Sequence, residues 1–143
     1  MAPHERLKAW QATHRLVLAW YRVTDAFPVK EKYGLIAQVR RSAFSAGANI
    51  AEGAAKSGAR EFARFLDIAL GSLGELEYAQ RLAADLSYLV GDDLKEIVEL
   101  QSSAGRLTRR LHQAIVAKAN ATHRDRGAAR LIPSRQHPPT SIQ

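Results

Sequence analysis

Apolar residues recur at alternating steps of three and four in four separate stretches of this chain, and no other feature constrains its fold as strongly. No proline interrupts them between Pro28 and Pro133. Such spacing puts apolar side chains on one face of an α-helix, and an average step of about 3.5 lets helices pack side by side at a shallow angle. We therefore predict four helices, near residues 6–27, 31–55, 59–89 and 92–122.

Four long helices joined by short links must alternate in direction. The pattern thus predicts an all-α fold, an antiparallel up-down-up-down four-helix bundle that forms one domain over residues 1–123. From about residue 124 the periodicity stops, and Gly, Pro, Arg and Ser dominate. We expect residues 124–143 to form a basic, proline-containing disordered tail.

Composition excludes several classes of protein. The 143 residues include no cysteine, which excludes a disulfide scaffold, a thiolate metal site and a thiol nucleophile. The longest apolar run, Leu16 to Tyr21, is far shorter than the roughly 18 residues of a membrane span. The first residues also lack the apolar segment of a signal peptide, so we expect a cytoplasmic protein with no membrane partner.

The sequence contains no arrangement typical of catalysis or cofactor binding. Glu-x-x-His, which a di-iron bundle needs, is absent, and so are Gly-x-Gly-x-x-Gly and a phosphate-binding Gly-Lys-Ser/Thr. The five histidines have no partner at a recurring ligand spacing, and His14 falls in an apolar row, where we expect a core position. We expect a non-enzymatic protein with no catalytic residue, no cofactor and no metal.

The second predicted helix is unusually rich in small residues. Gly47 and Gly53 each cost about 1 kcal/mol relative to alanine, a cost that close approach of a neighbouring helix would offset. Beside the apolar face runs a polar row at steps of four and three, made of Gln38, Ser42, Ser45, Asn49 and Glu52. This row is either a hydrogen-bonded ladder that fixes the register of the helices or a groove for a ligand or partner.

The formal net charge of +7 is unevenly distributed along the chain. In an alternating bundle, the start of the first helix, the link after the second and the end of the fourth meet at one end, which is basic, while the opposite end is acidic. We expect a basic rim there that contacts phosphates through Lys56, Arg60, Arg64, Lys118, Arg124 and Arg126. The alternative is that ordinary surface charges have segregated by chance.

The first predicted helix carries two adjacent apolar rows, with Trp10 in one and Trp20 in the other. A monomeric bundle needs one apolar stripe per helix. The extra width indicates a subunit interface that uses Trp10 or Trp20. The alternative is that both rows fill a wide core.

Short motifs spread over residues 7–115 give the chain a family resemblance. They include Trp10-Gln11, Phe27-Pro28, Tyr33-Gly34-Leu35, Asn49-Ile50-Ala51-Glu52-Gly53, Glu61-Phe62 and Gly71-Ser72-Leu73. In this order they resemble the four-helix-bundle proteins encoded by intervening sequences of bacterial 23S rRNA genes, and the related accessory (variability determinant) proteins of diversity-generating retroelements. The resemblance implies a homopentamer without enzymatic activity. It also implies nucleic acid as a partner of some relatives, and a reverse transcriptase with its RNA as the partner of the retroelement proteins.

Together these observations predict a non-catalytic homo-oligomer that binds RNA or DNA through its basic rim. The alternative is a structural or scaffolding oligomer that binds a protein partner such as a reverse transcriptase.

Overall fold

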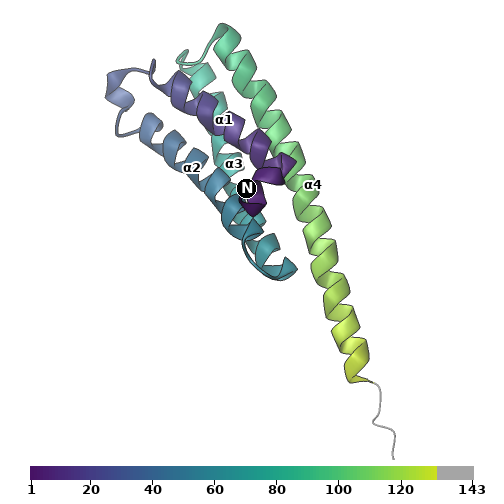
Figure 1. Ribbon diagram of the computed structural model, residues 1–143. Helices are drawn as coiled ribbons and strands as arrows, with labels where there is room; N and C mark the ends of the chain where they lie inside the picture. The colour runs from purple at the N-terminus through teal and green to yellow at the C-terminus, as the bar shows by residue number, and fades with distance from the viewer. Residues whose placement is uncertain (132–143) are drawn as a thin grey trace, which may run out of the picture.

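The computed structural model describes residues 1–131, and within them it contains four α-helices and no strand. The helices are α1 (Lys8–Thr24), α2 (Leu35–Ala54), α3 (Ala59–Asp85) and α4 (Gly91–Arg130), with single 3-10 turns at Pro3–Arg6 and Val29–Glu31 (Figure 1). Each of the four packs against two others: α1 contacts α2 and α4, and α3 contacts the same two helices. The predicted all-α, four-helix architecture is confirmed.

The core runs between the four helices and is built from the apolar rows that the spacing indicates. Its largest fully buried side chains come from every helix: Leu16, Trp20, Val39, Ile50, Leu66, Leu76 and Ile97. Trp20 is 0 % exposed, so the prediction that it contributes to a subunit interface is wrong. The apolar row of α1 that contains Trp20 faces the main core. The adjacent row, which contains Trp10, lies at the edge of that core.

The glycines of α2 have different surroundings. A Cβ atom built on Gly53 would lie 2.8 Å from Cδ2 of Phe62 and 2.8 Å from Cβ of Phe65, so α2 and α3 touch closely at this point. A Cβ atom on Gly47 would meet only a methyl of Val17, at 4.0 Å. The predicted close approach is therefore confirmed at Gly53 and wrong at Gly47, where the space for a methyl group is open.

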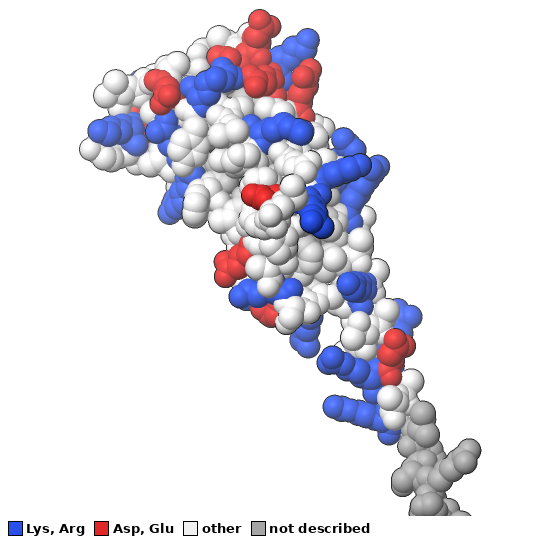
Figure 2. Space-filling view, in the orientation of Figure 1, with Lys and Arg blue, Asp and Glu red and all other residues white. Residues whose placement is uncertain are grey.

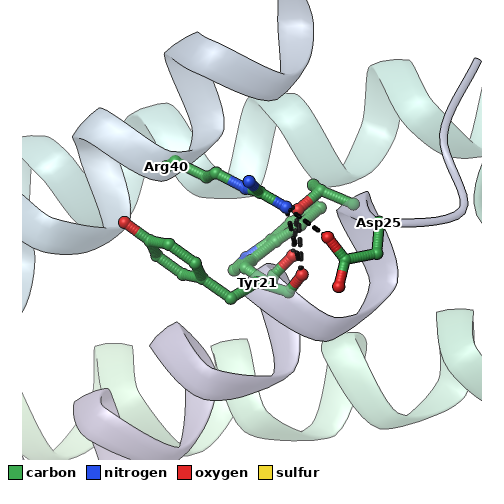
Figure 3. Close-up of polar contacts among 5 residues, drawn as sticks. Tyr21, Asp25 and Arg40 are labelled. Atoms are coloured by element: carbon green, nitrogen blue, oxygen red, sulfur yellow. Dashed lines mark hydrogen bonds and ion pairs between the residues drawn. The ribbon is translucent and has the colours of Figure 1, made fainter. Parts of the chain in front are cut away.

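An arginine ties α2 to the end of α1. Arg40 donates from Nη2 to Asp25 Oδ1 at 2.8 Å and from Nε to Thr24 Oγ1 at 3.1 Å (Figure 3). Its guanidinium also lies 5.0 Å from the centroid of the Tyr21 ring. Since the carbonyl end of a helix carries partial negative charge, a cation held there stabilises α1 as well as the contact between the two helices.

The longest helix, α4, extends well beyond the other three (Figure 1). It ends at Arg130, so the prediction of a disordered tail is wrong for residues 124–130; residues 132–143 lie outside the described residues. All side chains from Ala121 to Arg130 are exposed. This segment is therefore held by local helical hydrogen bonds rather than by packing, which explains why it has no apolar periodicity.

Candidate nucleic-acid interface

The polar row of α2 is partly a ladder between helices. Ser42 Oγ donates to Glu75 Oε2 at 2.6 Å, and Ser45 Oγ accepts a bond from Ser72 Oγ at 2.8 Å, so both serines join α2 to α3. Asn49 donates to the backbone oxygen of Ser45 at 2.8 Å, within α2. These bonds form a ladder in the middle of the row, where Ser42 and Ser45 also line a hollow of about 300 Å³ on the surface of α2 and α3.

The two ends of the row do not belong to that ladder. Gln38 is exposed and accepts a bond from Arg41, one turn along the same helix. Glu52 is exposed and lies 4.0 Å from Lys56, again within one turn. The row therefore contributes hydrogen bonds between helices over about one turn, at residues 42–45.

Two of the six predicted basic residues, Arg60 and Arg126, meet where the link between α2 and α3 faces the projecting part of α4. A hollow of about 350 Å³ lies there, and Arg60 of α3 lines it together with His123, Arg126 and Arg130 of α4. Its other lining residues are small or neutral: Gly58, Ala59, Ala119, Thr122 and Gly127. Within residues 1–131 no carboxylate lines the hollow and none forms an ion pair with its three guanidinium groups.

Arg130 and His123 are functional candidates that the sequence analysis missed. Both lie in or next to the segment expected to be disordered, where a helical position could not be assigned. Their spacing is the signal that would have found them. His123 lies four residues before Gly127, and Arg126 lies four residues before Arg130. If the helix continues, these residues lie on one face of it.

Two other predicted phosphate contacts are already engaged within the chain. Arg64 lies 3.3 Å from Glu61, and Lys56 lies 4.0 Å from Glu52. Both cations also stand over the ring of Phe65, with Arg64 at 4.7 Å and Lys56 at 5.4 Å from its centroid. These are exposed pairs of small energetic value, so both side chains can be recruited by a phosphate.

Lys118 and Arg124 are the remaining members of the predicted set, and both are exposed on α4. Neither lines the hollow at the link between α2 and α3. Arg124 lies two positions before Arg126, which does line it, so the two side chains point to different sides of α4. We define the basic rim by Lys56, Arg60, Arg64, Lys118, Arg124, Arg126 and Arg130.

Charge is segregated along the molecule. Figure 2 shows mostly blue side chains along the projecting part of α4, whereas red side chains gather at the opposite end. At that end Arg22 of α1 donates to Asp93 of α4 at 3.0 Å and also pairs with Glu96. The hydrogen bond to Asp93, reinforced by the charges of both acids, raises the pKa of Arg22 above its usual range. The predicted polarity of charge is thus present in the fold.

Trp10 lies at the edge of the core, half-buried, near the basic rim. It packs against the cluster of Ile50, Leu66 and Ala69 and stacks on His14, with ring centroids 4.8 Å apart and planes 8° from parallel. His14 is exposed, so the expected core position for it is wrong. His4 also packs against Trp10, with ring centroids 4.7 Å apart, so the indole contacts two histidine rings.

Residues 1–131 contain neither a metal-binding cluster nor a membrane-spanning helix. No group of three or more His, Cys, Asp or Glu side chains in this range could hold a metal ion. No helix in this range is long and apolar enough to cross a membrane.

The geometry defines an all-α protein of four packed helices with one basic end. The sequence model of the family described as 23S rRNA-intervening sequence protein matches residues 5–111. The chain therefore belongs to the 23S rRNA-intervening sequence protein family. The match stops before Lys118, so the α4 half of the basic rim lies outside it. No curated protein matches the chain.

Proposed function

We propose that this protein binds RNA or DNA through its basic rim, without catalysing a reaction on it and without a cofactor, in the cytoplasm. The observation that carries this proposal is the hollow in which Arg60, Arg126 and Arg130 meet, where the described part of the chain, residues 1–131, contributes no carboxylate to the lining. A phosphate placed there receives charge-assisted hydrogen bonds from two helices at once. Affinity then comes chiefly from phosphate contacts, so it carries little sequence preference of its own.

The proposal is tested by fluorescence anisotropy with a labelled single-stranded RNA and a DNA duplex. Wild-type protein is expected to bind, and about six phosphate contacts would lower the affinity about 10³-fold between 50 and 200 mM salt. Arg60→Glu combined with Arg126→Glu removes two cations from the hollow and is expected to abolish binding at 100 mM salt. Because both side chains are exposed, the melting temperature is expected to stay within about 2 °C of wild type.

The matched control changes the net charge equally at the other end of the molecule. Lys30→Glu combined with Lys95→Glu also reverses two exposed cations, and it is expected to leave binding within about threefold. Equal losses in both double variants would mean that net charge, rather than the rim, governs the interaction. Wild-type protein that binds neither nucleic acid would refute the proposal and favour a scaffold for a protein partner, such as a reverse transcriptase.

We also propose that the four helices run up-down-up-down and that the chain assembles as a homopentamer. Support for the helix order comes from α2 and α3, where Ser42 pairs with Glu75 and Ser45 with Ser72, so residue numbers rise along one helix as they fall along the other. A ring of parallel subunits would bring five basic rims to one side, which multiplies their attraction for a phosphate backbone.

Support for self-association comes from an apolar outer surface shared by α1 and α2. Leu18 is 57 % exposed and lies one turn before Tyr21, over whose ring Arg40 lies, and Phe44 is 69 % exposed and lies one turn after Arg40. Light scattering after gel filtration is expected to give a mass of five chains. Phe44→Glu is expected to reduce that mass, whereas Tyr78→Glu, at a similarly exposed aromatic of α3, is expected to leave it unchanged. A 15.8 kDa species in wild-type protein at micromolar concentration would refute the assembly.

A further inference from the structure

Another hollow, of about 260 Å³, lies between α3 and α4 and is distinct from the basic rim. Its walls include the apolar side chains of Leu70, Leu73 and Val98. It is open partly because Gly74 stands in its lining, where an added methyl group would meet no other atom within 4 Å. The space is large enough for one planar heterocycle between apolar walls.

Two glutamines that line this hollow, Gln80 and Gln101, each have a buried side-chain oxygen. Gln101 is 7 % exposed, and its Nε2 donates to the backbone oxygen of Leu73 at 2.9 Å. That bond fixes the amide, because turning it over would press its oxygen against the Leu73 carbonyl. Gln101 Oε1 is therefore fixed as a buried acceptor, and among residues 1–131 no group donates to it or to the buried Gln80 Oε1. Buried acceptors of this kind are costly unless something donates to them.

The charged groups of the hollow are one carboxylate and one guanidinium. Glu77 adds further acceptors on the α3 side, and Arg109 supplies donors from α4. Nη1 of Arg109 lies 3.1 Å from where a Cβ atom of Gly105 would stand, so the guanidinium folds over that glycine at the edge of the hollow. Neither Glu77 nor Arg109 forms an ion pair within residues 1–131. A ligand thus meets acceptors from both helices, Glu77 and Gln80 of α3 and Gln101 of α4, together with donors from Arg109 of α4.

We propose that this hollow binds a guanine base of a single-stranded nucleic acid. Guanine carries adjacent donors, N1–H and N2–H₂, on one edge and adjacent acceptors, O6 and N7, on another. The donor edge suits Gln80, Gln101 and Glu77, and the O6/N7 edge suits a bidentate contact from Arg109. Splayed bases of single strands are read on these same edges. The carboxylate of Glu77 disfavours a phosphate here, which separates this hollow from the basic rim.

The inference rests on the proposed function for the source of the base, since a strand held by the rim would present its bases to the rest of the molecule. It goes beyond that function because it adds a preference for one base. The rim supplies affinity through phosphates, and the hollow supplies discrimination through base edges.

Isothermal titration calorimetry of the full chain with guanosine, inosine and adenosine tests the inference without any phosphate. Guanosine is expected to bind. Inosine, which lacks the N2 amine, is expected to bind at least tenfold more weakly, and adenosine is expected not to bind. Arg109→Gln and Glu77→Gln each remove one exposed charged group and are expected to weaken guanosine binding at least tenfold. Arg106→Gln, an exposed arginine of α4 outside the lining, is the matched control and is expected to change nothing.

Each outcome separates this inference from the proposed function. Absence of guanosine binding at millimolar concentration, or equal binding of all three nucleosides, overturns the guanine site whatever the rim does. Equal losses in the Arg109 and Arg106 variants overturn it as well. If the rim variant Arg60→Glu/Arg126→Glu loses RNA but keeps guanosine, both proposals hold. If wild-type protein binds guanosine but no nucleic acid, the base site stands and the proposed function fails.

Discussion

Alanine substitutions at the two glycines of α2 are expected to change stability in opposite directions. In a helix interior, replacing glycine by alanine contributes about 1 kcal/mol when the new methyl group has room. Gly47 meets that condition, because its added Cβ would approach only Val17, at 4.0 Å. Gly47→Ala is therefore expected to raise the free energy of unfolding by about 1 kcal/mol.

At Gly53 the same propensity gain meets a steric conflict. The new Cβ atom would lie 2.8 Å from Cδ2 of Phe62 and from Cβ of Phe65, where ordinary carbon contacts lie near 3.5–4.0 Å. The Phe65 Cβ atom is fixed to the backbone of α3, so relief requires the two helices to separate. Overpacking of this kind costs about 1–3 kcal/mol, and more when backbone must move. After the propensity gain, Gly53→Ala is expected to lower stability by about 1–2 kcal/mol.

Urea unfolding followed by circular dichroism at 222 nm, at one fixed protein concentration for every variant, measures both changes. A fixed concentration matters because self-association shifts apparent stability. The expected difference between the two variants is about 2–3 kcal/mol, well above the error of the method. If Gly53→Ala proves as stable as Gly47→Ala, the close contact between α2 and α3 does not exist as described, and the reasoning fails.

Three further predictions concern the core, the contact between α1 and α2, and the end of α4. Thr108 is 0 % exposed and its hydroxyl has no partner, so Thr108→Val is expected to stabilise the fold by about 1 kcal/mol in the same urea assay. Thr24→Val is its control and is expected to destabilise the fold, because the Thr24 hydroxyl donates to the Trp20 carbonyl at 2.7 Å and accepts from Arg40. If both variants are stabilised, the difference in hydrogen bonding between the two hydroxyls is contradicted. Arg40→Gln is expected to lower the free energy of unfolding by about 1 kcal/mol, because it loses the bonds to Thr24 and the exposed Asp25. Arg41→Gln is expected to leave that free energy unchanged, because Arg41 bonds to Gln38 within its own helix turn. Hydrogen exchange followed by mass spectrometry is expected to be fast across residues 121–130 and slow across residues 97–108, since only the latter segment packs against neighbouring helices. Equal protection in the two segments would show that a partner covers the end of α4.

Helix number and approximate position follow from the local sequence, but helix ends depend on details that periodicity does not carry. Leu86 and Leu89 continue the apolar row of α3, so the predicted helix runs to residue 89. The helix ends at Asp85 because Ser87 adopts a φ of 60° and the Tyr88 N–H bonds back to the Ala83 carbonyl at 2.9 Å. This turn ends helices commonly, but it usually contains glycine, so nothing at Ser87 indicates it.

Part of the candidate site was predictable for the same reason. Arg60 follows directly after the turn that separates two periodic stretches, so its position at one end could be inferred. Arg130 could not, because the last turns of α4 bury nothing and leave no periodic signal. The hollow between α3 and α4 was missed entirely, since Gln80 and Gln101 lie 21 residues apart and only packing brings them together.

The sequence by itself determined that the chain forms four helices with apolar faces, because 3.6-residue periodicity is a local property that each segment expresses without the others. Only the tertiary structure decided which of two adjacent rows becomes core. On α1 the row that contains Trp20 is buried, whereas His14, in the adjacent row, is exposed. The spacing of the sequence predicts an apolar face for both rows. A row is buried or exposed according to where the neighbouring helices lie around it, and that arrangement is set by the close packing of all four helices together.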